Sequence, residues 1–208
     1  MNSWTYCLSC HILMSIVKTE AWIKAGYKLF GKEGIEGVKV ERLARILQLN
    51  KSGFYHYFGS MNSFLKSLLR YHVSMARYIA AEAAACENLD PDLLLLIIKH
   101  KTFFLVESQL LVRCKTTHFG ADIDEAGKII NKETLPLWRK ATQLPEDSTV
   151  ALAYLNIILH YFYARVTPDN MNYEFLHSLA VETRGVLNKV ADEKHIGSEK
   201  TGGLMHPE

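Results

Sequence analysis

The chain has 208 residues, of which 49% are hydrophobic, and its formal net charge at pH 7 is +2. This length suits one or two small domains, and this apolar content supports a folded core, which excludes a largely disordered chain. The apolar runs are shorter than the roughly 20 residues that cross a bilayer, and four cysteines are too few for a disulfide framework here, so we expect a cytoplasmic protein with no membrane partner.

The first 15 residues are expected to be a disordered N-terminal extension, and both Met1 and Met14 are candidate translation starts. Cys7, Cys10 and His11 have the C-x-x-C-H spacing of covalent haem attachment. Such attachment normally requires export, and the segment lacks the features of a secretory signal. We therefore expect no cofactor, and a haem protein remains the weaker alternative.

Residues 16–60 carry the periodicity of three helices and are expected to form one domain. The first helix is predicted to end near "GKEGIEG", a second spans about 40–47, and a third spans about 51–57 after the turn "QLN", with Asn50 as its N-cap. The apolar stripe of the first helix consists of Trp22, Ala25, Gly26, Leu29 and Phe30.

Two short helices joined by a tight turn and braced by a third form a helix-turn-helix, whose second helix enters the major groove of DNA. Residues 15–60 hold eight Lys or Arg residues against four acidic residues, so the basic excess of the chain lies here. Four apolar side chains are expected to pin the third helix to its neighbours: Leu47, Leu49, Phe54 and Phe58.

The start of the third helix is suited to a close approach to DNA. Ser52 and Gly53 are small, Lys51 adds a positive charge, and the free N–H groups of a helix start favour phosphate or base acceptors. Three side chains that follow are expected to reach outward to phosphates or bases: Tyr55, His56 and Tyr57.

The stretch "AGYKLFGKEGIEGVKVERLARILQLNKSGFYHYFGSMNSFL" resembles the N-terminal domain of TetR-type (TetR/AcrR) transcriptional regulators. The positions that carry the resemblance are Leu29, Phe30, Gly34, Leu43, Ala44, Gly53, Phe54, Tyr55, Tyr57, Phe58 and Ser60. The resemblance implies a homodimeric repressor that binds a double-stranded DNA operator and is released by a small-molecule effector bound in the C-terminal domain.

By matching position, the resemblance implies that Tyr55 and Tyr57 contact phosphate and that Lys51, Ser52 and His56 lie nearest the bases. We complete the DNA-contacting set with Lys39, Arg42, Asn50 and Gly53. The alternative is a helical dimer of the same fold that binds a small molecule or a protein partner without binding DNA.

Four residues depart from the family pattern. Gln48 stands at a turn position where glycine is common, and Gly26 stands where a helix alanine is usual. Lys39 replaces the usual capping Ser or Thr, and Met61 replaces a lysine that commonly grips phosphate. If Gln48 has a positive φ, strain of about 1 kcal/mol is expected there.

Residues 61–193 are predicted to form a larger helical domain, which makes the whole chain all-α. A long helix capped by Ser60 leads to about residue 85, and a helix opened by Asp90 and Pro91 carries the apolar run "LLLLII". Further helices are predicted over about 123–138, 146–166 and 173–192, and residues 194–208 are expected to be a disordered tail. The resemblance implies that the last two helices form a four-helix dimer bundle.

The C-terminal domain is apolar enough to enclose a ligand cavity. Its candidate lining residues are Phe103, Phe104, Trp138, Tyr154, Asn156, His160 and Tyr161, although each alone is more often plain core. The stretch "HFGADIDE", residues 118–125, is better explained as a solvated helix start than as a metal site. No nucleophile–base pair, phosphate loop or carboxylate pair indicates catalysis, so an enzyme is not expected. We hypothesise that ligand shifts the helix that follows Ser60 and so moves the recognition helices.

Overall fold

The computed structural model describes residues 3–113, 120–142 and 148–185, with side chains over 14–112, 125–142 and 152–185. Within these ranges the chain is helical apart from short connections and contains no β-strand, which confirms the all-α prediction. None of the helices described is long and apolar enough to cross a membrane.

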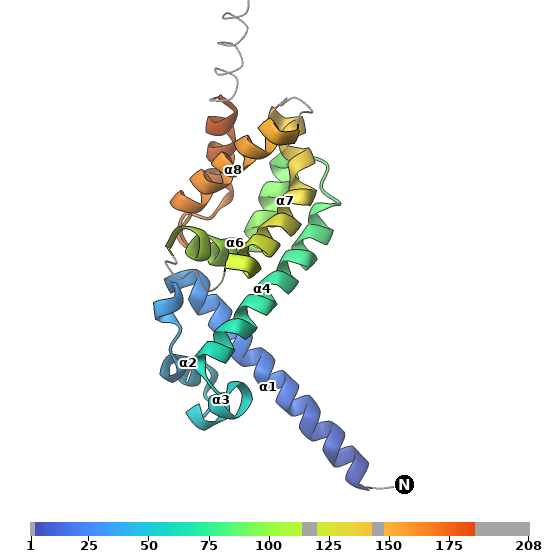
Figure 1. The fold of residues 1–208 in the computed structure, drawn as a ribbon, viewed down its shortest axis with the longest axis vertical. Coiled ribbons are helices and arrows are strands. Elements are labelled where there is room, and N and C mark those ends of the chain that lie inside the picture. Colours follow the sequence, from blue (N-terminus) through green and yellow to red (C-terminus); the bar gives the residue numbers. More distant parts are fainter. Residues whose placement is uncertain (1–2, 114–119, 143–147, 186–208) are drawn as a thin grey trace, which may run out of the picture.

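The helices follow one another with short connections (Figure 1). Their bounds are α1 Ser3–Glu33, η1 Ile35–Gly37, α2 Val40–Leu47, α3 Lys51–Phe58, α4 Met61–Ala83, η2 Leu89–Leu93, α5 Leu94–Lys99, α6 Lys101–Ser108, η3 Gln109–Arg113, α7 Gly120–Thr142, α8 Ser148–Arg165 and a C-terminal helix over 173–185.

The short helices α2 and α3 lie beside α1 and the start of α4, and the N-terminal part of α1 projects from the body of the molecule (Figure 1). The predicted helix over 40–47 is confirmed, and α3 extends one residue beyond its predicted end. Helix α1 begins at Ser3, within the stretch that we expected to be disordered, so it is longer than its sequence pattern predicted.

One hydrophobic core joins α1, α2, α3 and the start of α4. Trp22, Leu43, Phe54 and Phe64 are fully buried in it, and the rings of Trp22 and Phe54 meet edge-on with centroids 5.4 Å apart. Edge-to-face aromatic pairs add about 0.5–1.5 kcal/mol beyond the burial of their area. The same core includes Val106, so α6 also contacts this part of the chain.

The helix ends agree only in part with the capping predictions. Ser60 caps α4 as predicted, because its Oγ accepts a hydrogen bond from the N–H of Ser63 at 3.1 Å. Asn50 and Lys39 occupy the N-cap positions of α3 and α2 with extended backbones, but neither side chain forms a capping bond. Asp90, predicted as a cap, instead accepts hydrogen bonds from Tyr173 and His177.

The helix predicted after Pro91 is broken at His100, which has φ −106° and ψ 28°. Glu82 of α4 lies at the break and binds Lys99 at 2.7 Å and His100 at 2.6 Å. The hydrogen bonds from Lys99 and then His100 lower the pKa of Glu82 to about 2. Glu82 therefore links α4 to the junction between α5 and α6 through two hydrogen bonds.

A second, larger core lies between α4, α5, α6, α7, α8 and the C-terminal helix. Helix α4 runs along α7 (Figure 1), and α8 packs against both α6 and α7. Helix α7 continues through Pro136, where a kink was predicted. The predicted tail over 194–208 lies outside the described residues.

Candidate DNA-contacting surface and ligand cavity

Helix α3 is held from behind by its two phenylalanines, as the sequence predicted. Phe54 is fully buried and Phe58 nearly so, and both rings contact Phe64 of α4, with centroids 5.0 and 4.7 Å apart. Because these residues are i and i+4 on the helix, they occupy one face and leave the opposite face outward. The orientation of α3 is thus fixed by the core.

Most of the predicted DNA-contacting residues lie on the outer side of α2 and α3. The exposed ones are Lys39, Asn50, Lys51, Ser52, Tyr55 and His56, and the half-buried ones are Arg42, Gly53 and Tyr57. Tyr55 is 51% exposed. Tyr57 packs against the edge of the N-terminal core, so it presents less of its ring to a partner than Tyr55 does.

Two of the basic residues are already paired with acids of the same domain. Arg42 forms a bidentate ion pair with Glu33, and Lys51 Nζ lies 2.9 Å from Glu41 Oε1. Hydrogen bonding from Arg42 lowers the pKa of Glu33, and hydrogen bonding from Lys51 lowers that of Glu41. Exposed pairs of this kind are worth about 0–1 kcal/mol, so a phosphate can displace them.

The four departures from the family pattern each have a structural setting. Gln48 has φ 54° and ψ 40°, the left-handed conformation, so the condition for strain at this residue is met. A Cβ on Gly26 would lie 2.5 Å from Phe64 Cζ, which explains the absence of alanine there. Met61 packs against the N-terminal core, and Lys39 forms no side-chain cap.

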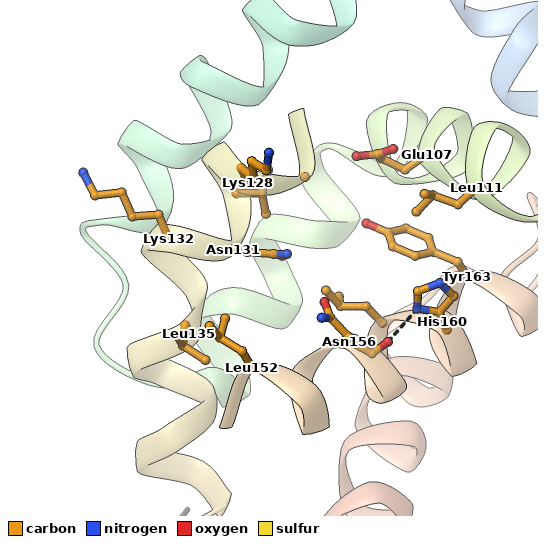
Figure 2. Close-up of a pocket in the computed structure, with 13 residues that line it drawn as sticks. Glu107, Leu111, Lys128, Asn131, Lys132, Leu135, Leu152, Asn156, His160 and Tyr163 are labelled. Carbon is orange, nitrogen blue, oxygen red and sulfur yellow. Dashed lines mark hydrogen bonds between the residues drawn. The ribbon is translucent and has the colours of Figure 1, made fainter. Parts of the chain in front are cut away.

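A cavity of about 570 Å³ lies between α6, α7 and α8, within the range of small-molecule sites. Figure 2 shows Glu107 and Leu111 on one side, Asn131 on another, and Asn156, His160 and Tyr163 on a third. Asn156 and His160 were predicted to line such a cavity, and His160 Nδ1 lies 2.7 Å from the backbone oxygen of Asn156.

The other predicted lining residues are not brought to this cavity. Phe104 and Trp138 line a narrow neighbouring space of about 50 Å³, and Phe103 lines a third space of about 270 Å³. Tyr154 lines none of these three spaces, and Tyr161 is exposed and donates a hydrogen bond to Glu182 at 2.8 Å.

Sequence reasoning missed the polar group buried in the wall of the cavity, Glu107 of α6, which is 1% exposed. The available signal was a single acid inside the apolar stretch "FFLVESQLLV". Burial raises the pKa of Tyr163, which lines the same cavity, well above its ordinary value, and the charge of Glu107 adds to this. The same two causes raise the pKa of Tyr27.

Within the described side chains, no group of three or more His, Cys, Asp or Glu residues is placed to hold a metal ion. The side chains of the C-x-x-C-H motif, and those of residues 118–124, lie outside the described set.

Helices α2 and α3 are joined by a tight turn and braced by α1, and α3 is anchored by the core while its first turn is exposed. This arrangement is a helix-turn-helix. Residues 23–68 match the family described as bacterial regulatory proteins, tetR family. This match agrees with the resemblance seen in the sequence, and it covers the N-terminal helices α2 and α3 with the adjoining parts of α1 and α4. A search of the curated proteins found no match to the chain.

Proposed function

We propose that the protein is a dimeric, sequence-specific DNA-binding regulator, a cytoplasmic repressor that a small-molecule ligand releases from its operator. The observation that carries the proposal is the outward face of α3. Tyr55 and the leading turn of the helix are exposed, while Phe54 and Phe58 hold the helix from behind. This geometry suits insertion of the first turn into a major groove, with Tyr55 donating to a phosphate.

Dimerisation through α8 and the C-terminal helix is supported by apolar side chains that the single chain leaves exposed. Leu152, Ile157 and Val181 are exposed, and Ile157 reaches 64%. Exposed apolar positions on two consecutive helices favour a partner surface. Because a twofold interface pairs the same patch on both copies, these helices would form a four-helix bundle between protomers.

Ligand release is supported by the packing of α4 on α7, because α7 lines the cavity and α4 leads to the helix-turn-helix. We place the DNA-binding domain at 16–60 and the ligand-binding and dimerisation domain at 61–193. Helix α4 belongs to both cores, since Phe64 and Leu68 lie in the first and Ile79 in the second. A ligand that shifts α4 would change the separation of the two recognition helices, and a coupling of about 1–3 kcal/mol makes a useful switch.

One observation favours the alternative, a helical dimer that does not bind DNA. Arg42 and Lys51 are neutralised by Glu33 and Glu41, which lowers the positive charge of the proposed DNA surface. Because both pairs are exposed and therefore weak, we retain DNA binding as the proposal.

The test is fluorescence anisotropy on DNA from upstream of the chain's own gene, over a salt series. We expect binding whose affinity falls steeply with salt, and a loss of about 3- to 10-fold in Tyr55→Phe, the size of one hydrogen bond. Tyr78→Phe is the matched control, because Tyr78 is similarly exposed, at 54%, but lies far along α4. If the unaltered protein showed no salt-dependent binding to this DNA, the alternative would replace the proposal.

A further inference from the structure

Glu107 is an acid that the protein buries without completing its hydrogen bonds. It is 1% exposed, it lies in the wall of the 570 Å³ cavity, and its Oε2 has no hydrogen-bond partner among the described residues. Leaving a carboxylate in such a place is costly unless another group pairs with it. The site therefore lacks a hydrogen-bond donor at this oxygen.

The imidazole of His72 lies at ion-pair distance from this oxygen but forms no hydrogen bond with it. His72 Nε2 lies 3.6 Å from Glu107 Oε2, beyond hydrogen-bond distance, and also has no hydrogen-bond partner. The imidazole is fully buried, stacked on Phe103 with centroids 4.4 Å apart, and its Nδ1 is joined to the hydroxyl of Tyr27 at 2.6 Å. These contacts restrain the orientation of the ring.

The other cavity walls combine aliphatic side chains with the polar residues Asn131, Asn156, His160 and Tyr163. The aliphatic side chains include Leu111, Ile130 and Leu135. Lys128 and Lys132 also line it, but both are exposed, and in Figure 2 the Lys132 side chain extends away from Glu107. The cavity therefore brings together a buried acid and aliphatic side chains, while its two lysines are exposed.

We propose that the cavity binds an organic amine, a protonated ammonium group on an apolar body, with Glu107 as its counter-charge and hydrogen-bond acceptor. This inference rests on the proposed function and adds the chemical class of the effector. The ammonium pairs with the carboxylate of Glu107 in the cavity wall, and its apolar body packs on the aliphatic side chains of the cavity. A charge-assisted bond of this kind is about twice as strong as a neutral one.

The position of Glu107 also connects the amine site to the DNA-binding domain. Glu107 lies on α6, His72 on α4 and Tyr27 on α1. His72 is buried between the other two: its Nε2 faces Glu107, and its Nδ1 is hydrogen-bonded to the hydroxyl of Tyr27. An ammonium at Glu107 changes the charge that faces His72, and His72 is the hydrogen-bond partner of Tyr27. The occupied site thus acts on the helix that braces the helix-turn-helix.

The test compares three probes of one skeleton, 4-phenylbutylamine, 4-phenylbutanol and 4-phenylbutyrate, by isothermal titration calorimetry on the full chain without DNA. We expect the amine to bind at least about tenfold more tightly than the alcohol, and the carboxylate most weakly. Glu107→Gln should remove the preference for the amine, whereas Lys132→Gln, at an exposed lysine of the cavity, should retain it. Equal affinity for amine and alcohol, no binding of any probe, or an unchanged preference in Glu107→Gln would overturn the proposal.

The comparison of probes uses the unaltered protein, so it remains decisive even if Glu107→Gln does not fold. It also needs no DNA, so failure of the amine site and failure of DNA binding give different results. For the connection to α1, Tyr27→Phe should keep the affinity for the amine within about twofold but reduce the amine's effect on DNA affinity. If the amine weakened DNA binding equally in Tyr27→Phe, the route through His72 would be wrong.

Discussion

Replacement of Gly26 by alanine tests whether the packing of the N-terminal core, rather than helix propensity, selects the residue at this position. Gly26 lies inside α1, where alanine is intrinsically favoured by about 1 kcal/mol. Its added Cβ would lie 2.5 Å from Cζ and 2.9 Å from Cε1 of Phe64, and 3.4 Å from Cδ2 of Leu68. The first two distances are shorter than carbon atoms tolerate, so the ring or the helix must move.

The ring has little room to move. Phe64 is fully buried, and the rings of Phe54 and Phe58 contact it at centroid distances of 5.0 and 4.7 Å. Overpacking of such a core costs about 1–3 kcal/mol, which equals or exceeds the gain of about 1 kcal/mol in helix propensity. We therefore expect Gly26→Ala to lower the free energy of unfolding by up to about 2 kcal/mol.

The assay is urea unfolding followed by circular dichroism at one fixed protein concentration. Gly127→Ala is the matched control, because Gly127 also lies inside a helix but a Cβ there meets nothing within 4 Å. The control should gain up to about 1 kcal/mol. If Gly26→Ala stabilised the protein as much as Gly127→Ala, the steric reasoning would be refuted.

Three further substitutions test the charges and the turn. Glu41→Gln removes the acid paired with Lys51, so DNA affinity in the anisotropy assay should rise by about two- to fivefold at 0.1 M salt, and a fall would contradict this. The pKa of Glu82 is lowered from 4.5 to about 2, mainly by Lys99, so its stabilising effect is present above pH 4.5 and is lost as the pH falls towards 2. Glu82→Gln should therefore lower the melting temperature at pH 7 and flatten its fall between pH 4.5 and 2 in scanning calorimetry, whereas an unchanged acid profile would count against this contact. Gln48→Gly should raise the free energy of unfolding by up to about 1 kcal/mol, because glycine adopts the left-handed conformation without strain, and destabilisation in the urea assay would be the contrary result.

The helix-turn-helix was predictable because its signals are local. Apolar spacing and the turn "QLN" located α2 and α3 within one residue, and the i, i+4 relation of Phe54 and Phe58 predicted their burial. The left-handed conformation of Gln48 was considered only as a condition, because the family that the sequence resembles commonly has glycine at this turn position. Each of these features depends on neighbours within a few residues along the chain.

The ligand cavity was less predictable because its walls come from three helices that are distant in sequence. Asn156 and His160 were anticipated, but the periodicity of α8 does not distinguish the face towards the cavity from the outer face that carries Tyr161. The burial of Glu107 depends on how α4 and α8 pack against α6, and a local sequence pattern does not contain this information. Sequence could mark Glu107 as unusual, but not place it beside His72.

The central claim is that α3 enters the major groove in two symmetry-related copies. Dimethyl sulfate interference on the bound upstream fragment tests it directly, because the reagent modifies guanine N7 in that groove. We expect two blocked patches on one face of the duplex, with centres about 34–36 Å apart or a multiple of this distance. Binding that tolerates major-groove methylation at every guanine would contradict the account.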